Sequence, residues 1–391
     1  MYAIDTELVN VETPNEHHAA TTPLYQSATF YQPSLSEPQE YDYTRSGNPT
    51  RTTLERHLAK IMGNAAQAFA VHSGMSALDV LSRLLVNGDE IIAGNDLYGG
   101  SSRLLTFLKT QQGIVTHHVD TSRVGEITAR LNAHTKIVLL ESPTNPQCRI
   151  CDIPAVAQAV KASEFGRRVL VVVDNTMMSP INADPFELRA DIWYESATKY
   201  LSGHHDLMAG AIAVRDPELA KQVGFVINAN GAGLAPFDCW LLLRGIKTLG
   251  LRFERQQQNA VAVAQYLKEV GPQLKVPKFE LLWPGDPELP GYEVHARTTR
   301  GPGSVLSIRT HDVAVSERIV EAAKLYKVSV SFGTVNSLIS LPCKMSHASI
   351  DAKTRAERGF PEDIVRLCIG IEDPKDLVAD LEAAFRKAGA L

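Results

Sequence analysis

Val169-Leu170-Val171-Val172-Val173 is an apolar run that ends in Asp174 and is followed by Asn175 and Thr176. It is short and lacks the in-and-out alternation of a half-buried strand, which indicates a strand buried on both faces. Candidate helices and further apolar runs alternate along the chain. The helices are 77–86 and 156–162, and the other runs are 68–71, 91–93, 137–140 and 211–214. Strands that alternate with helices predict βαβ units, so we expect an α/β fold with a mostly parallel sheet.

The residue pattern changes near residues 50 and 240, which predicts that the chain has three parts. Residues 1–50 are rich in Thr, Pro, Tyr, Ser and Asn and predict an extended N-terminal arm. Residues 51–240 hold the alternation and predict a large domain. Residues 241–391 predict a smaller α+β domain, because a helix over 257–270 precedes short strands near 304–309 and 328–331. A last helix follows, with Asp373 as its cap and Pro374 in its first turn.

Composition excludes several classes of protein. The chain of 391 residues has 39 basic and 44 acidic residues and a net charge of -5, which gives no basic footprint for nucleic acid. No apolar run is long enough for a membrane span, and the first residues do not resemble a secretory signal. Five cysteines, including a lone Cys148-x-x-Cys151 pair, predict neither a disulfide framework nor a metal site. We therefore expect a cytoplasmic protein.

The most informative stretch runs from Glu195 to His204 and contains Lys199. A solvated lysine is the common alternative, but Ser196 and Thr198 are hydroxyl donors suited to phosphate oxygens. An amine beside a phosphate is what pyridoxal phosphate requires of its binding lysine. This stretch therefore indicates a pyridoxal phosphate site.

Two further features agree with this interpretation. Ligands bind at the carboxyl ends of strands in open α/β sheets, so Asp174 is placed to pair with a cationic ring nitrogen. Gly74 and Met75 lie between a strand and a helix, where backbone N–H groups can hold a phosphate. The alternatives are an Asp that caps a turn and small residues in a tight turn.

The sequence resembles the pyridoxal-phosphate enzymes of cysteine and methionine metabolism, and the matching segments run almost end to end. They are 41–51 (YDYTRSGNPTR), 73–77 (SGMSA), 96–100 (DLYGG), 141–146 (ESPTNP), 173–176 (VDNT), 196–199 (SATK), 236–240 (PFDCW) and 366–373 (RLCIGIED). The resemblance implies the fold of PLP-dependent transferases, which is aspartate aminotransferase-like and known as fold type I.

The resemblance also implies roles for the matching residues. Lys199 would be the lysine that forms the imine with the cofactor, and Asp174 would bind the pyridine nitrogen. Tyr98 would stack on the ring and take part in catalysis. The residues implied to hold the phosphate are Gly74, Met75, Ser196 and Thr198.

Other matching residues concern the substrate and the assembly. Tyr43 and Arg45 resemble the pair that reaches the cofactor phosphate of a neighbouring subunit, which implies a site shared across a dimer and a dimer of dimers. The substrate is expected to be a small amino acid. The residues implied to orient its carboxylate are Asn145, Ser337 and Arg366.

Two segments point to one reaction within the family. Residues 331–350 and 199–210 resemble the cystathionine β-lyases of fungi and plants, and Asn336 stands where cystathionine γ-lyases and many γ-synthases have Glu. We therefore expect β-elimination of cystathionine to homocysteine, pyruvate and ammonia. The alternative is γ-elimination or γ-replacement on O-acetyl-L-homoserine. A binding protein on an inactive enzyme fold is disfavoured, because Lys199 and Asp174 are both present.

Overall fold

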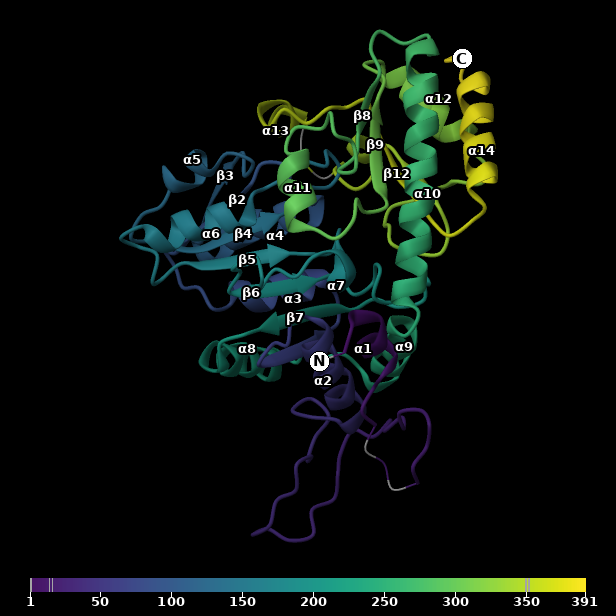
Figure 1. Cartoon of the computed structure of the whole chain (residues 1–391). Helices are drawn as coiled ribbons and strands as arrows, with labels where there is room; N and C mark the ends of the chain where they lie inside the picture. The colour runs from purple at the N-terminus through teal and green to yellow at the C-terminus, as the bar shows by residue number, and fades with distance from the viewer. Residues whose placement is uncertain (1, 14, 16, 349, 351) are drawn as a thin grey trace.

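The computed structural model describes residues 2–13, 15, 17–348, 350 and 352–391 (Figure 1). A seven-stranded sheet in the order β1-β7-β6-β5-β4-β2-β3 forms the large domain. Neighbouring strands from β3 to β6 are parallel, and β7 is antiparallel to both of its neighbours. The strands are β1 (Gln67–Val71), β2 (Glu90–Gly94), β3 (Val115–Val119), β4 (Thr135–Glu141), β5 (Leu170–Asp174), β6 (Ile192–Glu195) and β7 (Gly210–Val214).

The helices of this part begin where capping residues satisfy their first N–H groups. Asn48, Ser73 and Asp152 each accept hydrogen bonds from the first turn of the helix that follows. The helices are α1 (Ile4–Val9), α2 (Pro49–Ile61), α3 (Gly74–Ser82), α4 (Gly99–Gln112), α5 (Val124–Thr128), α6 (Ile153–Ala162), α7 (Ser179–Asn182), α8 (Pro217–Asn230) and α9 (Pro236–Ile246).

The C-terminal part has its own five-stranded sheet, in the order β10-β11-β12-β9-β8. Its strands are β8 (Glu280–Leu282), β9 (Val305–Arg309), β10 (Lys327–Val328), β11 (Leu338–Ser340) and β12 (Ile364–Cys368). Its helices are α10 (Leu249–Val270), α11 (Tyr292–Thr298), α12 (Val313–Ala322), α13 (Ala352–Glu357) and α14 (Pro374–Lys387), and Asp373 caps α14 as expected. Two short 3-10 helices are Gly271–Gln273 and Pro342–Lys344.

The predicted alternation of strands and helices is confirmed, but several bounds were wrong. The helix expected over 77–86 begins at Gly74 and ends at Ser82, because Ser73 caps it three residues earlier than the apolar pattern indicates. Strands β3 and β6 were not predicted, nor were β8, β11 and β12. The strand expected over 328–331 ends at Val328, because Ser331 has a left-handed backbone with φ 88°.

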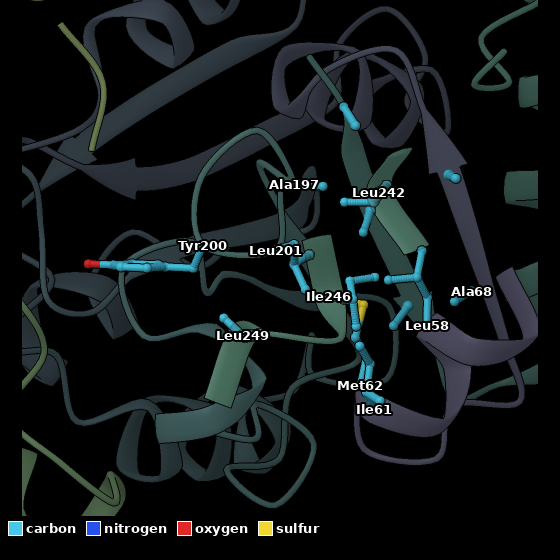
Figure 2. Close-up of a cluster of buried hydrophobic side chains, with 14 of the residues drawn as sticks. Leu58, Ile61, Met62, Ala68, Ala197, Tyr200, Leu201, Leu242, Ile246 and Leu249 are labelled. Atoms are coloured by element: carbon cyan, nitrogen blue, oxygen red, sulfur yellow. The ribbon is translucent and has the colours of Figure 1, made fainter. Parts of the chain in front are cut away.

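A buried cluster fixes the segment that carries Lys199. Ala197, Tyr200 and Leu201 are buried in it. In Figure 2, Ala197 and Leu201 lie near Leu242 and Ile246 of α9, whereas the Tyr200 ring points the other way. The first turns of α10 join the same cluster through Leu249 and Phe253. Further along, Ala260, Val263, Ala264 and Leu267 of α10 belong to the core of the C-terminal part. We propose that α9 and α10 connect the two domains, since the boundary placed at 240/241 lies inside α9.

Part of the N-terminal arm extends away from the large domain (Figure 1), whereas Leu8 of α1 is buried in the cluster that contains residues of α2 and α9. An antiparallel bridge between Thr29 and Tyr43 joins the two limbs of the arm, and the Gln32 side chain adds hydrogen bonds between them. Tyr31 and Leu35 near its tip are fully exposed apolar side chains. Contrary to the expectation of a wholly extended arm, α1 forms at its start. Among the described helices, none combines the length and apolar character needed to cross a bilayer.

The C-terminal helix offers a test of the second core. Leu381 is fully buried in that cluster, so Leu381→Ala should lower the free energy of unfolding by about 2–5 kcal/mol through lost contacts and a cavity. Lys375→Ala on the exposed face should change it by less than about 0.5 kcal/mol. Denaturant unfolding followed by circular dichroism measures both, and equal effects would contradict the assignment of this core.

Candidate active site

A pocket of about 180 Å³ lies at the carboxyl ends of β4, β5 and β6. The N-terminus of α3, the segment around Lys199, residues 331–332 and β12 complete its walls. It brings together most of the residues singled out in the sequence. Those are Gly74, Met75, Tyr98, Asn145, Asp174, Ser196, Thr198, Lys199 and Arg366.

Strand register sets the floor of this pocket. Glu141 of β4 is paired with Asp174 of β5, and Asp174 is paired with Tyr194 of β6. All three side chains line the pocket. Parallel strands end at the same edge of a sheet, so the terminal residues of neighbouring strands meet there.

The Asp174 carboxylate is anchored from one side. Its Oδ1 accepts hydrogen bonds from the Thr176 backbone N–H at 2.9 Å and from the Thr176 hydroxyl. Burial raises the pKa of Asp174, while the bonds from Thr176 and the neighbouring Tyr194 hydroxyl oppose that rise. Both Thr176 donors use Oδ1, and none of the described hydrogen bonds ends on Oδ2.

Glu141 sits beside Asp174 as a second buried acid. Burial, together with the charges of Asp174 and Asp96, raises the pKa of Glu141 well above its usual range. Two adjacent carboxyl groups in a buried site cannot both ionise readily. Glu141 therefore favours its protonated form more strongly than Asp174 does, because the hydrogen bonds from Thr176 stabilise the charged form of Asp174.

Lys199 is half-buried and faces this acid pair. Burial lowers its pKa to about 8, and the positive charge of Arg366 acts in the same direction. Its Nζ donates a hydrogen bond to Ser331 Oγ at 2.7 Å. The next residue is locked in place, since the Tyr200 hydroxyl is 2.7 Å from Ser304 Oγ. A lysine in this setting can lose its proton near neutral pH and act as a nucleophile or base.

The start of α3 forms a close-fitting cradle. A Cβ at Gly74 would lie 2.8 Å from Ser196 Cβ, and one at Gly210 would lie 2.2 Å from the Ser73 carbonyl oxygen. The Thr198 hydroxyl accepts from Ala209 N–H at 3.0 Å, which fixes its position on the pocket wall. Backbone N–H groups at such a helix start, with hydroxyls opposite, suit a phosphate group.

Arg366 and Asn145 form the opposite wall. Arg366 is buried, and its Nη1 donates to Asn145 Oδ1 at 2.9 Å. Within the described residues, Nε of Arg366 has no hydrogen-bond partner. An arginine fork beside an amide is a suitable receptor for a carboxylate.

Tyr98 is a partly exposed residue at the mouth of the pocket, just before α4. A Cβ at Gly100 would lie 2.5 Å from its ring, so Gly100 leaves room for the ring. An aromatic ring in this position can stack on a planar ligand, as the sequence predicts for Tyr98.

Three predicted site residues lie away from the pocket. Ser337 is buried and binds elsewhere: its Oγ donates to Glu372 Oε2 and accepts from Gly370 N–H, both at 2.8 Å. Tyr43 and Arg45 are exposed on the arm, and Arg45 Nη1 donates to Asn228 Oδ1 at 2.7 Å. Their roles stay predictions.

Other pocket residues were missed from the sequence. Glu141 could have been found, because it ends an apolar run as Asp174 does. Tyr194 follows from strand β6, which was not predicted. Nothing in the local pattern singles out Ser331 or Phe332. The missed lining residues are Ser73, Ser101, Glu141, Thr176, Met177, Tyr194, Met208, Ser331 and Phe332.

Cys148 and Cys151 lie in the protein interior. Both thiols are free and buried, and burial raises the pKa of each. The Cys148 thiol donates to the Pro146 carbonyl at 3.8 Å. Among the described residues, no cluster of three or more His, Cys, Asp or Glu side chains could hold a metal ion.

Comparison with known proteins assigns the family. Residues 5–386 match the family described as Cys/Met metabolism PLP-dependent enzyme. The chain belongs to this family. It is 57% identical to a cystathionine β-lyase of Neurospora crassa over 100% of this chain and 83% of that protein. It is 51% identical to a cystathionine β-lyase of Schizosaccharomyces pombe over 99% and 97% of the two chains.

Solved structures of the family share the fold. A cystathionine γ-lyase from Lactobacillus plantarum, complexed with L-serine, superposes with a TM-score of 0.94 and 34% identity over 100% of both chains. The predicted fold class of PLP-dependent transferases is therefore confirmed.

The pocket of this family member fits pyridoxal phosphate. The cradle at Gly74 is too tight for a side chain but open to an anion, the Asp174 carboxylate can accept from a ring N–H, and Lys199 supplies an amine of lowered pKa. These residues would hold the phosphate, the ring nitrogen and the aldehyde carbon, respectively.

The lowered pKa of Lys199 gives a testable rate profile. In protein stripped of cofactor, capture of added pyridoxal phosphate should rise with pH through about 8, because the neutral amine is the reactive form. Arg366→Gln removes a nearby positive charge and should move this midpoint upward, whereas Arg366→Lys should not. Stopped-flow absorbance measures the pH midpoint of capture. A midpoint near the ordinary lysine pKa of 10.5 would contradict a buried Lys199 amine of lowered pKa.

Proposed function

We propose that this family member catalyses β-elimination of L-cystathionine to homocysteine, pyruvate and ammonia. The observation that carries the proposal is the placement of Lys199 between Asp174 and the Arg366–Asn145 pair in one pocket. The identity of 57% to the Neurospora crassa cystathionine β-lyase supports this choice of substrate. It also supports β-elimination over γ-chemistry on O-acetyl-L-homoserine.

The substrate is held by its α-carboxylate. Arg366 and Asn145 receive the α-carboxylate, which leaves the Cα–H bond facing Lys199. Tyr98 covers the pocket mouth and excludes water from the reacting atoms. When bound, pyridoxal phosphate supplies a protonated ring that accepts the electron pair left at Cα.

Lys199 and Asp174 then divide the acid–base work. Lys199 Nζ removes the Cα proton, the Cβ–S bond breaks, and the sulfur leaves as the thiol of homocysteine after it gains a proton. The remaining three-carbon fragment takes up water to give pyruvate and ammonia. Asp174 keeps its negative charge throughout, which holds a proton on the facing ring nitrogen.

For the assembly, we propose a homo-oligomer, a dimer of dimers, in the cytoplasm. The exposed arm with Tyr43 and Arg45 supports an active site shared between subunits, because these side chains are outside the pocket of their own chain. The five cysteines are free and buried, which supports a reducing compartment.

Product analysis tests the reaction. The purified protein should release pyruvate from cystathionine, and Lys199→Ala should abolish turnover and the yellow absorbance of the bound cofactor while it keeps the wild-type circular dichroism spectrum. Formation of 2-oxobutyrate, or of a carbon-extended amino acid from O-acetyl-L-homoserine in its place, would establish the alternative reaction.

Subunit mixing tests the shared site. Arg45→Ala should weaken phosphate binding, so that variant and Lys199→Ala should each show little turnover at limiting cofactor. Unfolding and refolding them together should restore turnover, because mixed dimers contain one pocket with both residues intact. Mixtures that stay as inactive as the separate variants would overturn the proposed role of the arm.

A further inference from the structure

Tyr194 is a buried phenol beside Asp174 on the floor of the pocket. The two residues are paired across β5 and β6, and Glu141 is paired with Asp174 on the β4 side. All three side chains line the pocket. Asp174 therefore has an acid on one side and a phenol on the other.

The Tyr194 hydroxyl is buried and, among the described residues, completes no hydrogen bond of ordinary geometry. It faces the Asp174 carboxyl group and the Ser101 hydroxyl. Burial raises the pKa of Tyr194 well above its usual range, so the phenol keeps its proton. A buried donor without an acceptor costs free energy, and the carboxylate beside it is the stronger acceptor of its two neighbours.

Asp174 has an oxygen available for this donor. Thr176 gives its backbone N–H and its hydroxyl proton to Oδ1. The Thr176 hydroxyl oxygen also accepts from Ser196 N–H at 2.8 Å, so its proton stays directed at Asp174. A carboxylate oxygen has two lone pairs, so Oδ2 can accept from Tyr194 and from a ring N–H at the same time.

The segments that carry the phenol and the carboxylate are tied together. The Asn175 backbone N–H donates to the Tyr194 carbonyl at 3.0 Å, and the Asn175 side chain donates to Glu195 Oε1 at 3.0 Å. Trp193 Nε1 donates to the same Glu195 oxygen at 2.8 Å. These buried contacts join β6 to the chain just after β5, so Tyr194 and Asp174 keep their relative position.

We propose that Tyr194 is a positioning residue: its hydroxyl donates to Asp174 Oδ2 and holds this carboxylate, ionised and oriented, for the pyridine nitrogen of the cofactor. The inference rests on the proposed role of Asp174 at that nitrogen. A hydrogen bond to a carboxylate stabilises its charged form. Tyr194 thereby adds to the preference for charge on Asp174 over Glu141.

Three variants isolate the hydroxyl. Tyr194→Phe removes it and keeps the ring in the floor of the pocket. Tyr326→Phe is the matched control, because the Tyr326 hydroxyl is also buried without a partner among the described residues but belongs to the core of the C-terminal part. Asp174→Asn removes the carboxylate itself.

The first readout is the binding of two cofactors by full-length protein stripped of its own. One is pyridoxal phosphate, and the other is 1-deazapyridoxal phosphate, in which a C–H group replaces the ring nitrogen. Titration followed by absorbance gives the dissociation constant of each. The ratio of the two constants cancels any general loss of folding, phosphate binding or imine formation, because both compounds share those features.

Tyr194→Phe should lower the preference for pyridoxal phosphate over the deaza compound about tenfold, the size expected for one hydrogen bond to a charged group. The reason is that Asp174 then ionises less readily beside Glu141 and its carboxylate is free to rotate. Tyr326→Phe should keep the wild-type preference. In Asp174→Asn protein, the added Tyr194→Phe change should have no further effect.

The second readout is nitrogen-15 NMR of pyridoxal phosphate labelled at the ring nitrogen and bound to the full-length protein. The wild-type signal should be that of a protonated ring, and Tyr194→Phe should move it toward the unprotonated position. A wild-type signal or a wild-type cofactor preference in Tyr194→Phe would overturn the proposal.

Failure of the underlying role of Asp174 gives a different result. If Asp174→Asn kept the wild-type cofactor preference, the carboxylate would not serve the ring nitrogen, and Tyr194 would lose its proposed purpose. Neither readout needs turnover of cystathionine. Tyr194 is therefore judged independently of whether the enzyme releases pyruvate from that substrate.

Discussion

The charge balance among two carboxyl groups and one amine is the constraint on which the site depends. Glu141 and Asp174 are side by side because β4 and β5 run parallel and end in register. Burial then allows only one of them to ionise readily, and the amine of Lys199 faces the pair with its pKa lowered to about 8. The sheet therefore delivers a single negative charge where a cationic ring needs it, and an amine that can lose its proton.

The positions of these groups are set mainly by the packing of the backbone segments that carry them. Lys199 is flanked by Ala197 and Tyr200, which are buried in the core, so its Cα cannot shift without disturbing the packing. Arg366 lies on β12, in the central part of the second sheet. Arg366 thus stands on a strand and Lys199 on a turn held by buried neighbours, and the loop at Ser331 contacts both side chains.

The sequence predicted site residues best where a reactive side chain stands at the recognisable end of a strand or start of a helix. Asp174, Gly74 and Lys199 could be placed because a strand end, a helix start and a lysine between hydroxyl residues have recognisable patterns, and the resemblance located Arg366. Ser337 was expected at the substrate carboxylate, but its hydroxyl binds Glu372, a contact between distant segments that no local pattern encodes. Ser331 was expected in a short alternating strand, whereas its left-handed backbone is held by tertiary contacts to its carbonyl oxygen.

Helix α10 packs into the hydrophobic cores of both halves of the molecule. Its first turns are embedded in the core that carries the lysine segment, and its later turns are embedded in the core beneath the arginine strand. A hinge-like opening of the active site would have to bend this helix or repack one of those cores. The distance between the Lys199 amine and the Arg366 guanidinium therefore depends on the shape of α10, so a substitution that bends the middle of this helix would change that distance without touching the pocket.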